Sequence, residues 1–517
     1  MNAGDEGGQL YWRLTEGLLA DPSVSRGTMM GFPCMRTDGV LAQERQTCLH
    51  GRSGSARCTV CRRREQGQLG NSMTRTCEVV IVGGGIAGLT AAYRLRSRDV
   101  QLFEASERFG GRLKSAVRGE YWLNLGGHLL GGETGPMGRL ATELGIPLIT
   151  SPGSVSGVSL NGRVLRSSRP ELMPFRLAMS PGARWSFIRT GIRLKRAYRE
   201  ARRWDHSGLT GVTDDLSTYP ASPTLDGKTY AAVLGPMHPD VAALMRITAN
   251  RLATEPDRLS GHIGTVDTVG IWEMRRPNVV GGTEEVPKAL VRVLGDRLTA
   301  NATVEAAEGD DTGVTVHVRT ESGLEQVRAR ACIIAAPAPV VRQVVRGLPA
   351  AKDEALSLVT YGPFLVLGMF TDERGRMPWD EMYAVAVAKR SFCMFFNPAS
   401  VFRTPHGVRQ PGGALVVYAA GDQAAALMDK SDAQVVDTYL ADLREVFPQL
   451  ANSVRETVIQ RWPLGVPVAA PGRARLQPAL AAPVGRIAFT GDYIVHPGMD
   501  SAIVCSEAAV RTVERLL

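Results

Sequence analysis

No uninterrupted apolar run in this 517-residue chain approaches the ~18–20 residues that a membrane-spanning helix needs. The N-terminus also lacks a basic stretch followed by an apolar core, so we expect no secretory signal peptide. Both absences argue against a membrane-spanning or secreted protein, and the expected compartment is the cytoplasm. Hydrophobic residues make up 44% of the chain, which is enough for large cores in two or three domains.

A motif for nucleic-acid recognition is missing too, although the chain is modestly basic, with a net charge of +9 and a pI near 9.3. Net charge by itself bears on non-specific association and identifies no partner. We therefore expect no nucleic-acid partner and attribute the excess of arginine to an arginine-rich proteome.

Cysteines are few and scattered. Five of them lie mostly in apolar surroundings and are expected to be reduced core thiols: Cys34, Cys77, Cys332, Cys393 and Cys505. Three others lie near a histidine in a segment rich in Gly, Ser, Arg and Thr: Cys48, His50, Cys58 and Cys61. Their spacing fits no standard zinc finger, and apolar residues for a small core are missing. We expect no metal site, with zinc as the alternative, and residues 1–72 are predicted to be a disordered extension.

The chain is organised around residues 77–112. Glu78–Val82 is an apolar run rich in β-branched residues, which is typical of a buried strand in a parallel sheet. Gly83, Gly85 and Gly88 follow in a G-x-G-x-x-G pattern that opens a predicted helix. These glycines permit, in turn, a tight turn, close approach to a pyrophosphate, and packing of the helix on the strand. The N–H groups at the start of the helix suit the two phosphates.

A second predicted strand, Val100–Phe103, ends at Glu104. An acidic side chain at this strand end can accept hydrogen bonds from a ribose hydroxyl. Strand, glycine turn, helix, strand and acid in this order predict a dinucleotide-binding fold rather than an isolated glycine-rich turn.

The residues after this strand distinguish between nucleotides. Residues 104–112 read E-A-S-E-R-F-G-G-R, which resembles the E-A-x-x-R-x-G-G-R signature of the flavin amine oxidase superfamily. That superfamily also holds protoporphyrinogen oxidases and carotenoid desaturases, and NAD-binding domains lack the extension. The resemblance spans roughly residues 76–517. It implies non-covalent FAD as the cofactor, with Arg112 near the diphosphate and flavin.

Residues 121–130 resemble the family segment that passes along the isoalloxazine ring. Gly126 and Gly127 would permit close approach of the backbone to the flavin. Asn124 stands where the family usually has an acid, and its amide can still anchor the loop. His128 is the catalytic candidate, with a structural, hydrogen-bonding histidine as the alternative interpretation.

Later segments complete the predicted site. Val304 stands where the family holds the adenine through backbone groups, and Asp492, after Gly491, is expected at the ribityl or diphosphate region. A helix that begins near Met499 would direct its N-terminus at the flavin edge where negative charge collects on reduction. The predicted cofactor-binding residues are Gly83, Gly85, Ala87, Gly88, Glu104, Ala105, Gly111, Arg112, Gly126, Gly127, His128, Val304, Gly491, Asp492 and Met499.

Together these segments predict an α/β protein, built as an α+β arrangement of two domains. A Rossmann-like FAD-binding domain is expected from residues 73–140, 276–340 and 466–517. A substrate-binding domain of mixed sheet and helices is expected from residues 141–275 and 341–465. The hydrophobic pattern predicts further strands at residues 298–304, 313–318, 331–337, 356–370 and 414–420, and a helix over residues 431–447.

Residues 176–204 combine many basic residues with apolar and aromatic ones at helical spacing. An ordinary amphipathic helix with an exposed basic face is the favoured interpretation. Peripheral contact with an anionic membrane surface is the alternative.

Two absences argue against an amine substrate. Many amine oxidases carry a lysine on the strand equivalent to residues 356–370, and Gly498 stands where they commonly have an aromatic-cage tyrosine. We therefore expect an FAD-dependent oxidoreductase that transfers a hydride from a hydrophobic small molecule to flavin N5, as in protoporphyrinogen oxidases or desaturases. Dioxygen or another acceptor would take the electrons. The alternatives are a flavin amine oxidase acting on a small amine and a flavin-dependent isomerase; intact FAD motifs disfavour a prenyl-group chaperone of the same fold.

Overall fold

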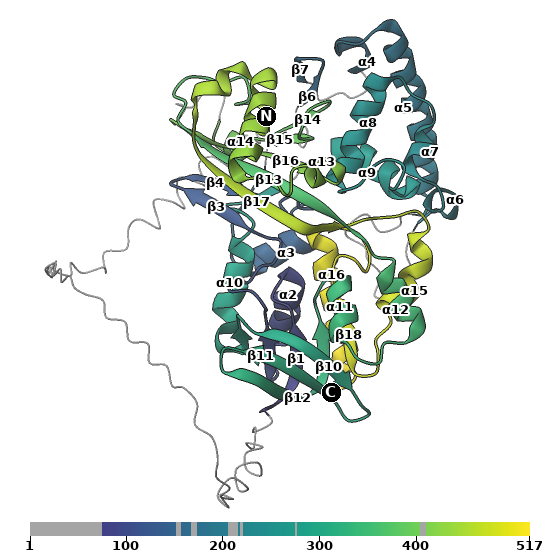
Figure 1. Cartoon of the computed structure of the whole chain (residues 1–517), viewed down its shortest axis with the longest axis vertical. Coiled ribbons are helices and arrows are strands. Elements are labelled where there is room, and N and C mark those ends of the chain that lie inside the picture. The colour runs from purple at the N-terminus through teal and green to yellow at the C-terminus, as the bar shows by residue number, and fades with distance from the viewer. Residues whose placement is uncertain are drawn as a thin grey trace, which may run out of the picture. The chain divides into compact units, whose positions relative to one another are not determined.

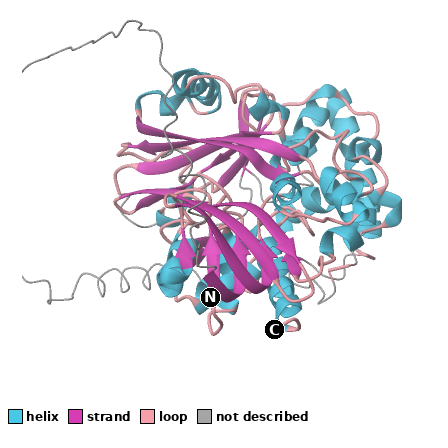
Figure 2. Ribbon diagram, turned by 60° about the horizontal axis from the view of Figure 1, so that its bottom comes forward, coloured by secondary structure: helices cyan, strands magenta, loops and turns pink. Residues whose placement is uncertain are grey.

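Two seven-stranded sheets form the framework of the described chain (Figures 1 and 2). The computed structural model describes residues 75–150, 157–166, 173–204, 216–217, 221–273, 277–403 and 410–517. The predicted extension, with the alternative zinc ligands and Cys34, lies outside the described residues. Residues 74–517 form one compact unit that contains both sheets.

The first sheet has the strand order β10-β11-β12-β1-β2-β9, and β18 pairs with β12. Its central strand, β1, is parallel to both of its neighbours, β2 and β12. Val79, Val80 and Ile81 of this strand are fully buried, as a run of β-branched residues between two helical layers requires. The strands of this sheet are β1 (Arg75–Val82), β2 (Val100–Phe103), β9 (Leu298–Thr299), β10 (Thr303–Gly309), β11 (Val314–Thr320), β12 (Gly323–Ile334) and β18 (Ile487–Phe489).

Helices pack on both faces of the first sheet. The face that carries Val79 and Ile81 contacts α2 (Ile86–Arg94), α3 (Pro136–Glu143), α10 (Glu285–Leu294) and α16 (Met499–Glu514). The face that carries Val80 and Val82 contacts α11 (Ala338–Val344), α12 (Ala350–Ser357) and α15 (Gln477–Ala481). Two 3₁₀ turns, η3 (Gly295–Arg297) and η6 (Arg473–Leu476), precede β9 and α15.

The strand predicted over residues 298–304 is split in two. Asn301, with φ of 51°, turns the chain between β9 and β10. Its backbone N–H donates to the Ser106 carbonyl over 3.0 Å, and that of Ala302 donates to the Glu104 carbonyl over 2.8 Å. This turn is therefore shaped by its hydrogen bonds to the loop after β2. Such a long-range contact cannot be predicted from the local hydrophobic pattern.

The second sheet has the order β17-β13-β16-β15-β14-β6-β7, antiparallel throughout except for the parallel pair β14–β6. Alternate residues of its strands face two separate cores. One face packs with Leu123 and Leu125, and the other packs against α14. The strands are β6 (Gly157–Leu160), β7 (Arg163–Arg166), β13 (Tyr361–Thr371), β14 (Ala384–Val387), β15 (Met394–Phe396), β16 (Gly413–Ala420) and β17 (Val454–Pro467).

A group of helices stands beside the second sheet, at the upper right of Figure 1. It comprises α4 (Met173–Arg176), α5 (Pro181–Ala201), α6 (Pro223–Asp226), α7 (Tyr230–Leu234), α8 (Pro239–Arg251) and α9 (Gly261–Glu273). The helix predicted over residues 431–447 is α14 (Asp432–Val446), which begins with a capping box of Ser431 and Gln434. The remaining elements are η4 (Pro398–Phe402), α13 (Asp422–Ala425), η5 (Pro448–Asn452) and the two-stranded sheets of β3 (Ser115–Arg118) with β4 (Tyr121–Asn124) and β5 (Leu148–Thr150) with β8 (Pro277–Val279).

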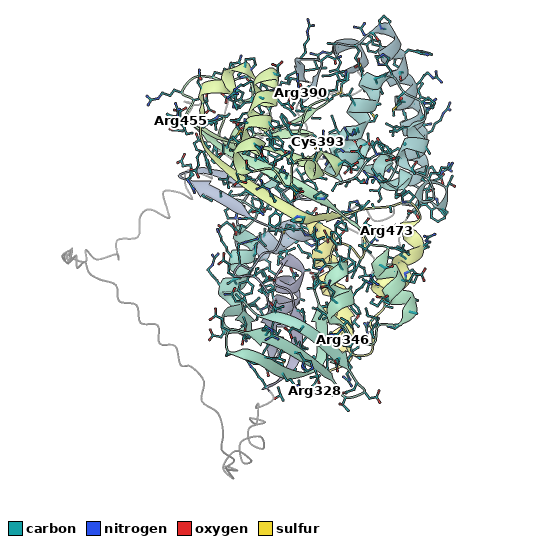
Figure 3. All side chains as sticks on the ribbon, in the orientation of Figure 1. Arg328, Arg346, Arg390, Cys393, Arg455 and Arg473 are labelled. Carbon is teal, nitrogen blue, oxygen red and sulfur yellow. The ribbon has the colours of Figure 1, made fainter. Side chains whose placement is uncertain are left out.

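Strands of the two sheets alternate along the sequence, and the predicted domain boundaries stay a prediction. Within the described residues, no helix combines the length and apolar character needed to cross a bilayer. The four described cysteines, Cys77, Cys332, Cys393 and Cys505, are buried free thiols, and Figure 3 labels Cys393 within the second sheet.

A buried lysine ties α12 to the end of α15. The Lys352 ammonium, 3% exposed, donates to the carbonyls of Ala479, Leu480 and Ala482 over 3.1, 3.1 and 2.6 Å. It also lies 3.8 Å from the centre of the Phe489 ring. Burial lowers the pKa of Lys352 to about 7. Hydrogen bonds to the three carbonyls favour the protonated ammonium.

Lys352→Met is expected to lower the free energy of unfolding by about 2 kcal/mol, because the carbonyls at the end of α15 lose their donor. Denaturant unfolding of the apoprotein measures this loss. Lys288→Met is the control, because Lys288 is 48% exposed and its pair with Glu285 contributes little. Equal losses in the two variants would show that the buried contacts of Lys352 are unimportant.

Candidate active site

The turn after β1 has no room for side chains at two of its glycines. Gly83 has φ of +103°, and a Cβ there would lie 2.7 Å from the Ala335 carbonyl oxygen. A Cβ at Gly88 would lie 1.9 Å from the carbonyl oxygen of Gly83. These two positions therefore require glycine because of the packing of β1, α2 and β12. A bound ligand is not needed to explain them.

Gly85 differs, because the protein itself leaves space beside it. The nearest atom to a Cβ at Gly85 would be the Cα of Gly111, 4.0 Å away. Gly85 is the N-cap of α2, and this helix start, at Ile86 and Ala87, has neither a side-chain cap nor an acid in its first turn. Uncapped N–H groups next to an open position suit a diphosphate, so the residues present fit FAD here.

Glu104 bridges this turn and the loop that follows β2. One carboxylate oxygen accepts the Gly84 N–H over 2.6 Å, and the other accepts the N–H and hydroxyl of Ser106 over 2.9 and 2.6 Å. Its backbone oxygen accepts the N–H of Ala302, which brings the start of β10, with Val304, alongside. Ala105 in this loop is exposed. Contact of Glu104 with a ribose stays a prediction.

The loop of residues 108–113 is fastened to the glycine turn. The Gly110 N–H donates to the Gly84 carbonyl over 2.8 Å, and Gly111 has φ of +53°. The Arg108 guanidinium donates to the carbonyls of Phe109, Gly111 and Leu113. It also forms an ion pair with Glu284 at 3.2 Å. Arg108 is therefore a further residue of the site, and its signal in the sequence is its place as the arginine of the E-A-x-x-R signature.

Arg112 joins three distant parts of the chain. Its guanidinium donates to Asp492 Oδ1 over 2.7 Å and to the Gly465 carbonyl over 2.8 Å. Burial acts to lower the pKa of Arg112, but the neighbouring Asp492 carboxylate more than offsets this and the net shift is upward. The structure thus brings together two predicted cofactor residues from opposite ends of the described sequence.

The turn at residues 126–129 packs on this loop. A Cβ at Gly126 would lie 2.0 Å from the Arg112 carbonyl oxygen, which accepts the Gly127 N–H over 3.0 Å. A Cβ at Gly127 would lie 3.1 Å from Cε of Met499, at the start of α16. Residues 126–129 are half-exposed although Leu125 and Leu130 are buried. Gly126 and Gly127 therefore lie against the Arg112 backbone, and Gly127 also lies against Met499. The cofactor contacts of these residues and of Gly491, which directly precedes Asp492, stay a prediction.

Asn124 anchors this turn through its side chain. The 3%-exposed amide accepts the Ser115 hydroxyl over 3.0 Å and both the N–H and the hydroxyl of Thr283, over 2.9 and 3.3 Å. The Thr283 hydroxyl shares its single hydrogen with the Gly127 carbonyl, which is the nearer acceptor at 2.7 Å. An acid at this position could accept the same three hydrogen bonds, which explains how an amide can replace it.

Asn124→Leu is expected to destabilise the protein by about 2 kcal/mol, because the buried Thr283 N–H would lose its acceptor. Asn124→Asp is expected to retain most of the stability and the bound flavin, because a carboxylate accepts as well as an amide. Thermal unfolding and flavin content measure both effects. An aspartate variant as unstable as the leucine variant would contradict the role given to the oxygen.

His128 faces the second sheet. Its Nδ1 lies 3.1 Å from the Gly126 carbonyl oxygen, and its ring meets Phe396 edge-on at 4.6 Å between centroids. Phe396 stacks on Tyr418 at 5.7 Å, and Tyr418 lies 5.2 Å from Phe364. Trp462 of β17 donates its indole N–H to the Leu125 carbonyl over 2.7 Å. We call Phe364, Phe396, Tyr418 and Trp462 the aromatic face; the catalytic role of His128 stays a prediction.

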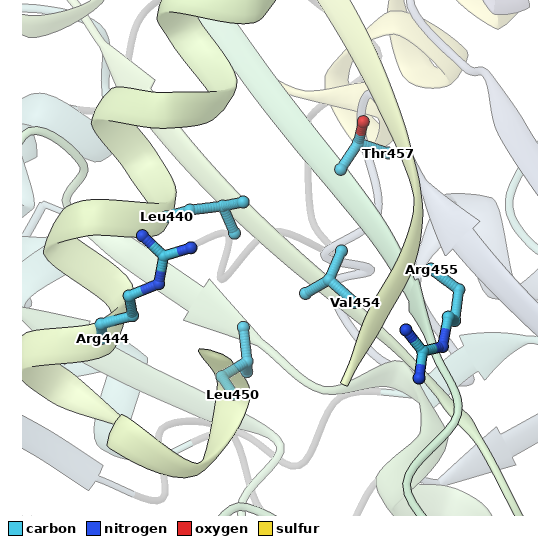
Figure 4. A pocket seen from close by; sticks show the side chains of 6 residues that line it. All are labelled: Leu440, Arg444, Leu450, Val454, Arg455 and Thr457. Carbon is cyan, nitrogen blue, oxygen red and sulfur yellow. The ribbon is translucent and has the colours of Figure 1, made fainter. Parts of the chain in front are cut away.

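A surface pocket elsewhere takes no part in this arrangement. It measures about 220 Å³ and lies between α14, η5 and the start of β17 (Figure 4). Leu440 and Val454, which line it, pack with the core on the α14 side of the second sheet. That side faces away from the aromatic face. The described residues also contain no group of three metal-ligating side chains.

Known proteins resemble this chain along most of its length. The model of one family, described as flavin-containing amine oxidoreductase, matches residues 86–514. An L-amino-acid oxidase from Demansia vestigiata is 24% identical, over 84% of this chain and 86% of its own length. A putative flavin-containing monoamine oxidase, AofH, from Mycobacterium tuberculosis is 29% identical, over 56% of this chain and 63% of its own length.

Solved structures share the fold. Putrescine oxidase superposes with a TM-score of 0.68 at 18% identity, over 86% of this chain and 99% of the other. Cyclohexylamine oxidase from Brevibacterium oxydans superposes with a TM-score of 0.67 at 20% identity, over 85% of this chain and 99% of the other. The two-domain α/β architecture predicted from the sequence is thereby confirmed.

Proposed function

This chain belongs to the family of flavin-containing amine oxidoreductases, and we propose that it oxidises an amine carried on an apolar body. Family membership makes the protein an oxidoreductase with FAD as its cofactor, as the sequence predicted. The aromatic face opposite the turn at residues 126–129 is the observation that carries the proposal about the substrate.

An amine substrate replaces the main interpretation from the sequence, an enzyme resembling protoporphyrinogen oxidases or desaturases. The matching family and the relatives named above are oxidases of amines and amino acids, which supports the alternative instead. The two departures noted in the sequence persist, because β13 carries no lysine and Gly498 precedes α16. The chemistry of this enzyme therefore has to proceed without those two side chains.

Bound FAD would supply the hydride acceptor for the carbon next to the substrate nitrogen, and dioxygen would reoxidise it. The chain's own residues would hold the cofactor and orient the substrate. Arg112, Asp492 and the N–H groups at the start of α2 provide charges and donors suited to the cofactor's diphosphate and ribityl region. The aromatic face and the turn at residues 126–129 supply apolar surface that would exclude water and position the substrate.

Phe364 is the member of the aromatic face best placed to contact substrate. Trp462 is half-exposed, but its indole N–H is bound to the Leu125 carbonyl. Phe364 is half-exposed as well, whereas Phe396 and Tyr418 are buried. It pairs across the strands with Trp462, and its ring lies against Gly465, whose carbonyl binds Arg112. Phe364 therefore adjoins both the substrate-domain sheet and the ion pair of Arg112 with Asp492.

The proposal is tested by flavin bleaching under anaerobic conditions with the purified holoenzyme. Ring-bearing amines such as cyclohexylamine are expected to bleach the flavin, with aliphatic diamines and L-amino acids slower. One equivalent of hydrogen peroxide per substrate is expected on admitting dioxygen. Bleaching by an apolar polyene or tetrapyrrole but by no amine would overturn the proposal, and turnover without net oxygen uptake would indicate an isomerase.

Phe364→Ala is expected to raise KM for ring-bearing amines about tenfold and to change KM for putrescine little, because a lost apolar contact costs about 1–3 kcal/mol. Phe370→Ala is the matched control. Phe370 lies on the same strand and the same face, but it contacts Arg118 rather than the residues around Arg112. Steady-state kinetics with the two substrates separate the variants, and equal KM shifts would contradict the placement of the substrate.

A further inference from the structure

The long helix α5 exposes one row of side chains that combines aromatic, aliphatic and cationic residues. Trp185, Arg189, Ile192, Arg196 and Arg199 recur at helical spacing on one side, and all five are exposed. Trp185 is 62% and Ile192 49% exposed. We call this row the outer face of α5.

The orientation of α5 is fixed by its opposite side. Ala183, Thr190, Leu194, Ala197 and Ala201 are buried against the neighbouring helices of the group. The side chain of Ser180 caps the helix by accepting the Ala183 N–H over 3.1 Å. In an ordinary amphipathic helix the large apolar residues would lie on the buried side. Here Leu194 is the one large apolar residue that is buried on that side, with alanines and a threonine beside it, while a tryptophan and an isoleucine point outward.

The outer face is cationic without compensation. No carboxylate of the described residues pairs with Arg189, Arg196 or Arg199. The acid of this helix, Glu200, is engaged by Arg203, and it also accepts from the indole of Trp204 at the helix end. The outer face therefore presents positive charge to a partner.

Within the part of the chain whose burial is described, the exposed aromatic side chains gather in this region. Among the described residues, the large aromatic side chains that are exposed are Phe175 at 64%, Trp185 at 62% and Trp204 at 44%. They lie on α4, on α5 and directly after α5, at the upper right of Figure 1. Scattered exposed apolar residues need no explanation, but this concentration of the aromatic ones marks an interaction surface.

We propose that the outer face of α5 lies on an anionic lipid surface. Tryptophan and phenylalanine settle at the level of the headgroups, and arginines beside them attract acidic lipids. The aliphatic Ile192 lies in the same row as Trp185 and the arginines, and a lipid surface can bury both apolar side chains while its headgroups meet the cations. A hollow of about 310 Å³ beside Trp185 and Arg189 gives room for a headgroup.

Sedimentation of the full-length holoenzyme with vesicles tests the proposal. Binding is expected to vesicles with about one-third phosphatidylglycerol, to weaken at high salt, and to be absent with phosphatidylcholine alone. Arg189→Gln/Arg196→Gln is expected to weaken binding roughly 30-fold, from about 1 kcal/mol for each cation near the surface. Trp185→Ser/Ile192→Ser is expected to weaken it at least tenfold and to abolish the blue shift of tryptophan emission on binding.

Arg292→Gln/Val293→Ser on α10 is the matched control. Val293 is 50% exposed, close to the value for Ile192, and Arg292 beside it is exposed. This variant is expected to bind vesicles like the parent, and all variants are expected to keep flavin and activity on a soluble amine. A parent that stays in the supernatant at low salt, or an α10 variant that loses as much binding as the α5 variants, would overturn the proposal. Unchanged binding by the tryptophan variant would also overturn it and indicate a soluble polyanion.

Discussion

Gly85→Ala is expected to give a folded protein that has lost most of its FAD. An alanine fits the protein itself, because φ of −71° is ordinary for an L-residue and the nearest atom to the new Cβ would be 4.0 Å away. The space that the methyl group would occupy is the open position in front of α2, where the diphosphate must approach the backbone. Overpacking of about 1–3 kcal/mol predicts FAD binding that is roughly 10- to 100-fold weaker.

Titration of the apoprotein with FAD measures this effect, and thermal unfolding without FAD shows whether the fold is intact. Gly88→Ala is expected to fail already at folding, because its Cβ would lie 1.9 Å from the Gly83 carbonyl oxygen. Gly191→Ala on α5 adds a methyl group where nothing lies within 4 Å, and it is expected to leave FAD affinity unchanged. Full FAD affinity in the Gly85 variant would exclude this turn from the cofactor site.

Arg112→Met is expected to destabilise the apoprotein by about 2 kcal/mol and to prevent stable FAD binding. The Asp492 carboxylate, 7% exposed, would be left without its cation, and the Gly465 carbonyl would lose a donor. Removing one partner of a buried pair usually costs more, but Arg112 itself is 35% exposed, and solvent reduces the penalty. The expected loss for FAD is larger, because the proposed role of the Arg112 guanidinium is to offer a cation to an anionic cofactor.

Flavin content of the purified variant and denaturant unfolding of its apoprotein separate the two effects. Arg118→Met is the matched control, because Arg118 likewise pairs with one carboxylate, that of Glu456 on β17, at 2.6 Å. That pair is 55% and 39% exposed, so its loss is expected to cost under about 1 kcal/mol and no flavin. If the Arg112 variant retains flavin as the Arg118 variant does, the ion pair with Asp492 serves the fold alone.

Local features of the cofactor site could be predicted because their chemistry is encoded in consecutive residues. The glycines of the turn follow an apolar strand directly, and Glu104 comes immediately after the next strand. Short-range sterics and the alternation of strand and helix fix such a unit without reference to the rest of the chain. For the same reason the hydrophobic pattern predicted α14 to within a residue at each end, and Ser431 caps it in the structure.

The substrate side could not be predicted in the same way. The sequence shows that Phe364 and Trp462 lie in strands, but alternation alone does not say which face of a sheet meets the cofactor domain. Here the register of β13 with β17 shifts between Gly362 and Phe364, and such a bulge depends on both strands. The orientation of α5 was open for a related reason, because its apolar and basic residues allow two rotations about the helix axis until its neighbours are placed.

The sequence by itself determined that this protein holds a dinucleotide, and its resemblance to a flavin family identified FAD, because strand, glycine turn and helix form from neighbouring residues. Only the tertiary structure decided that Arg112 meets both Gly465 and Asp492, that aromatic side chains face His128, and that Trp185 points outward. Each of these contacts joins segments far apart in the chain or selects one face of an element. Chain topology and packing settle such choices, because local propensity acts over only a few residues.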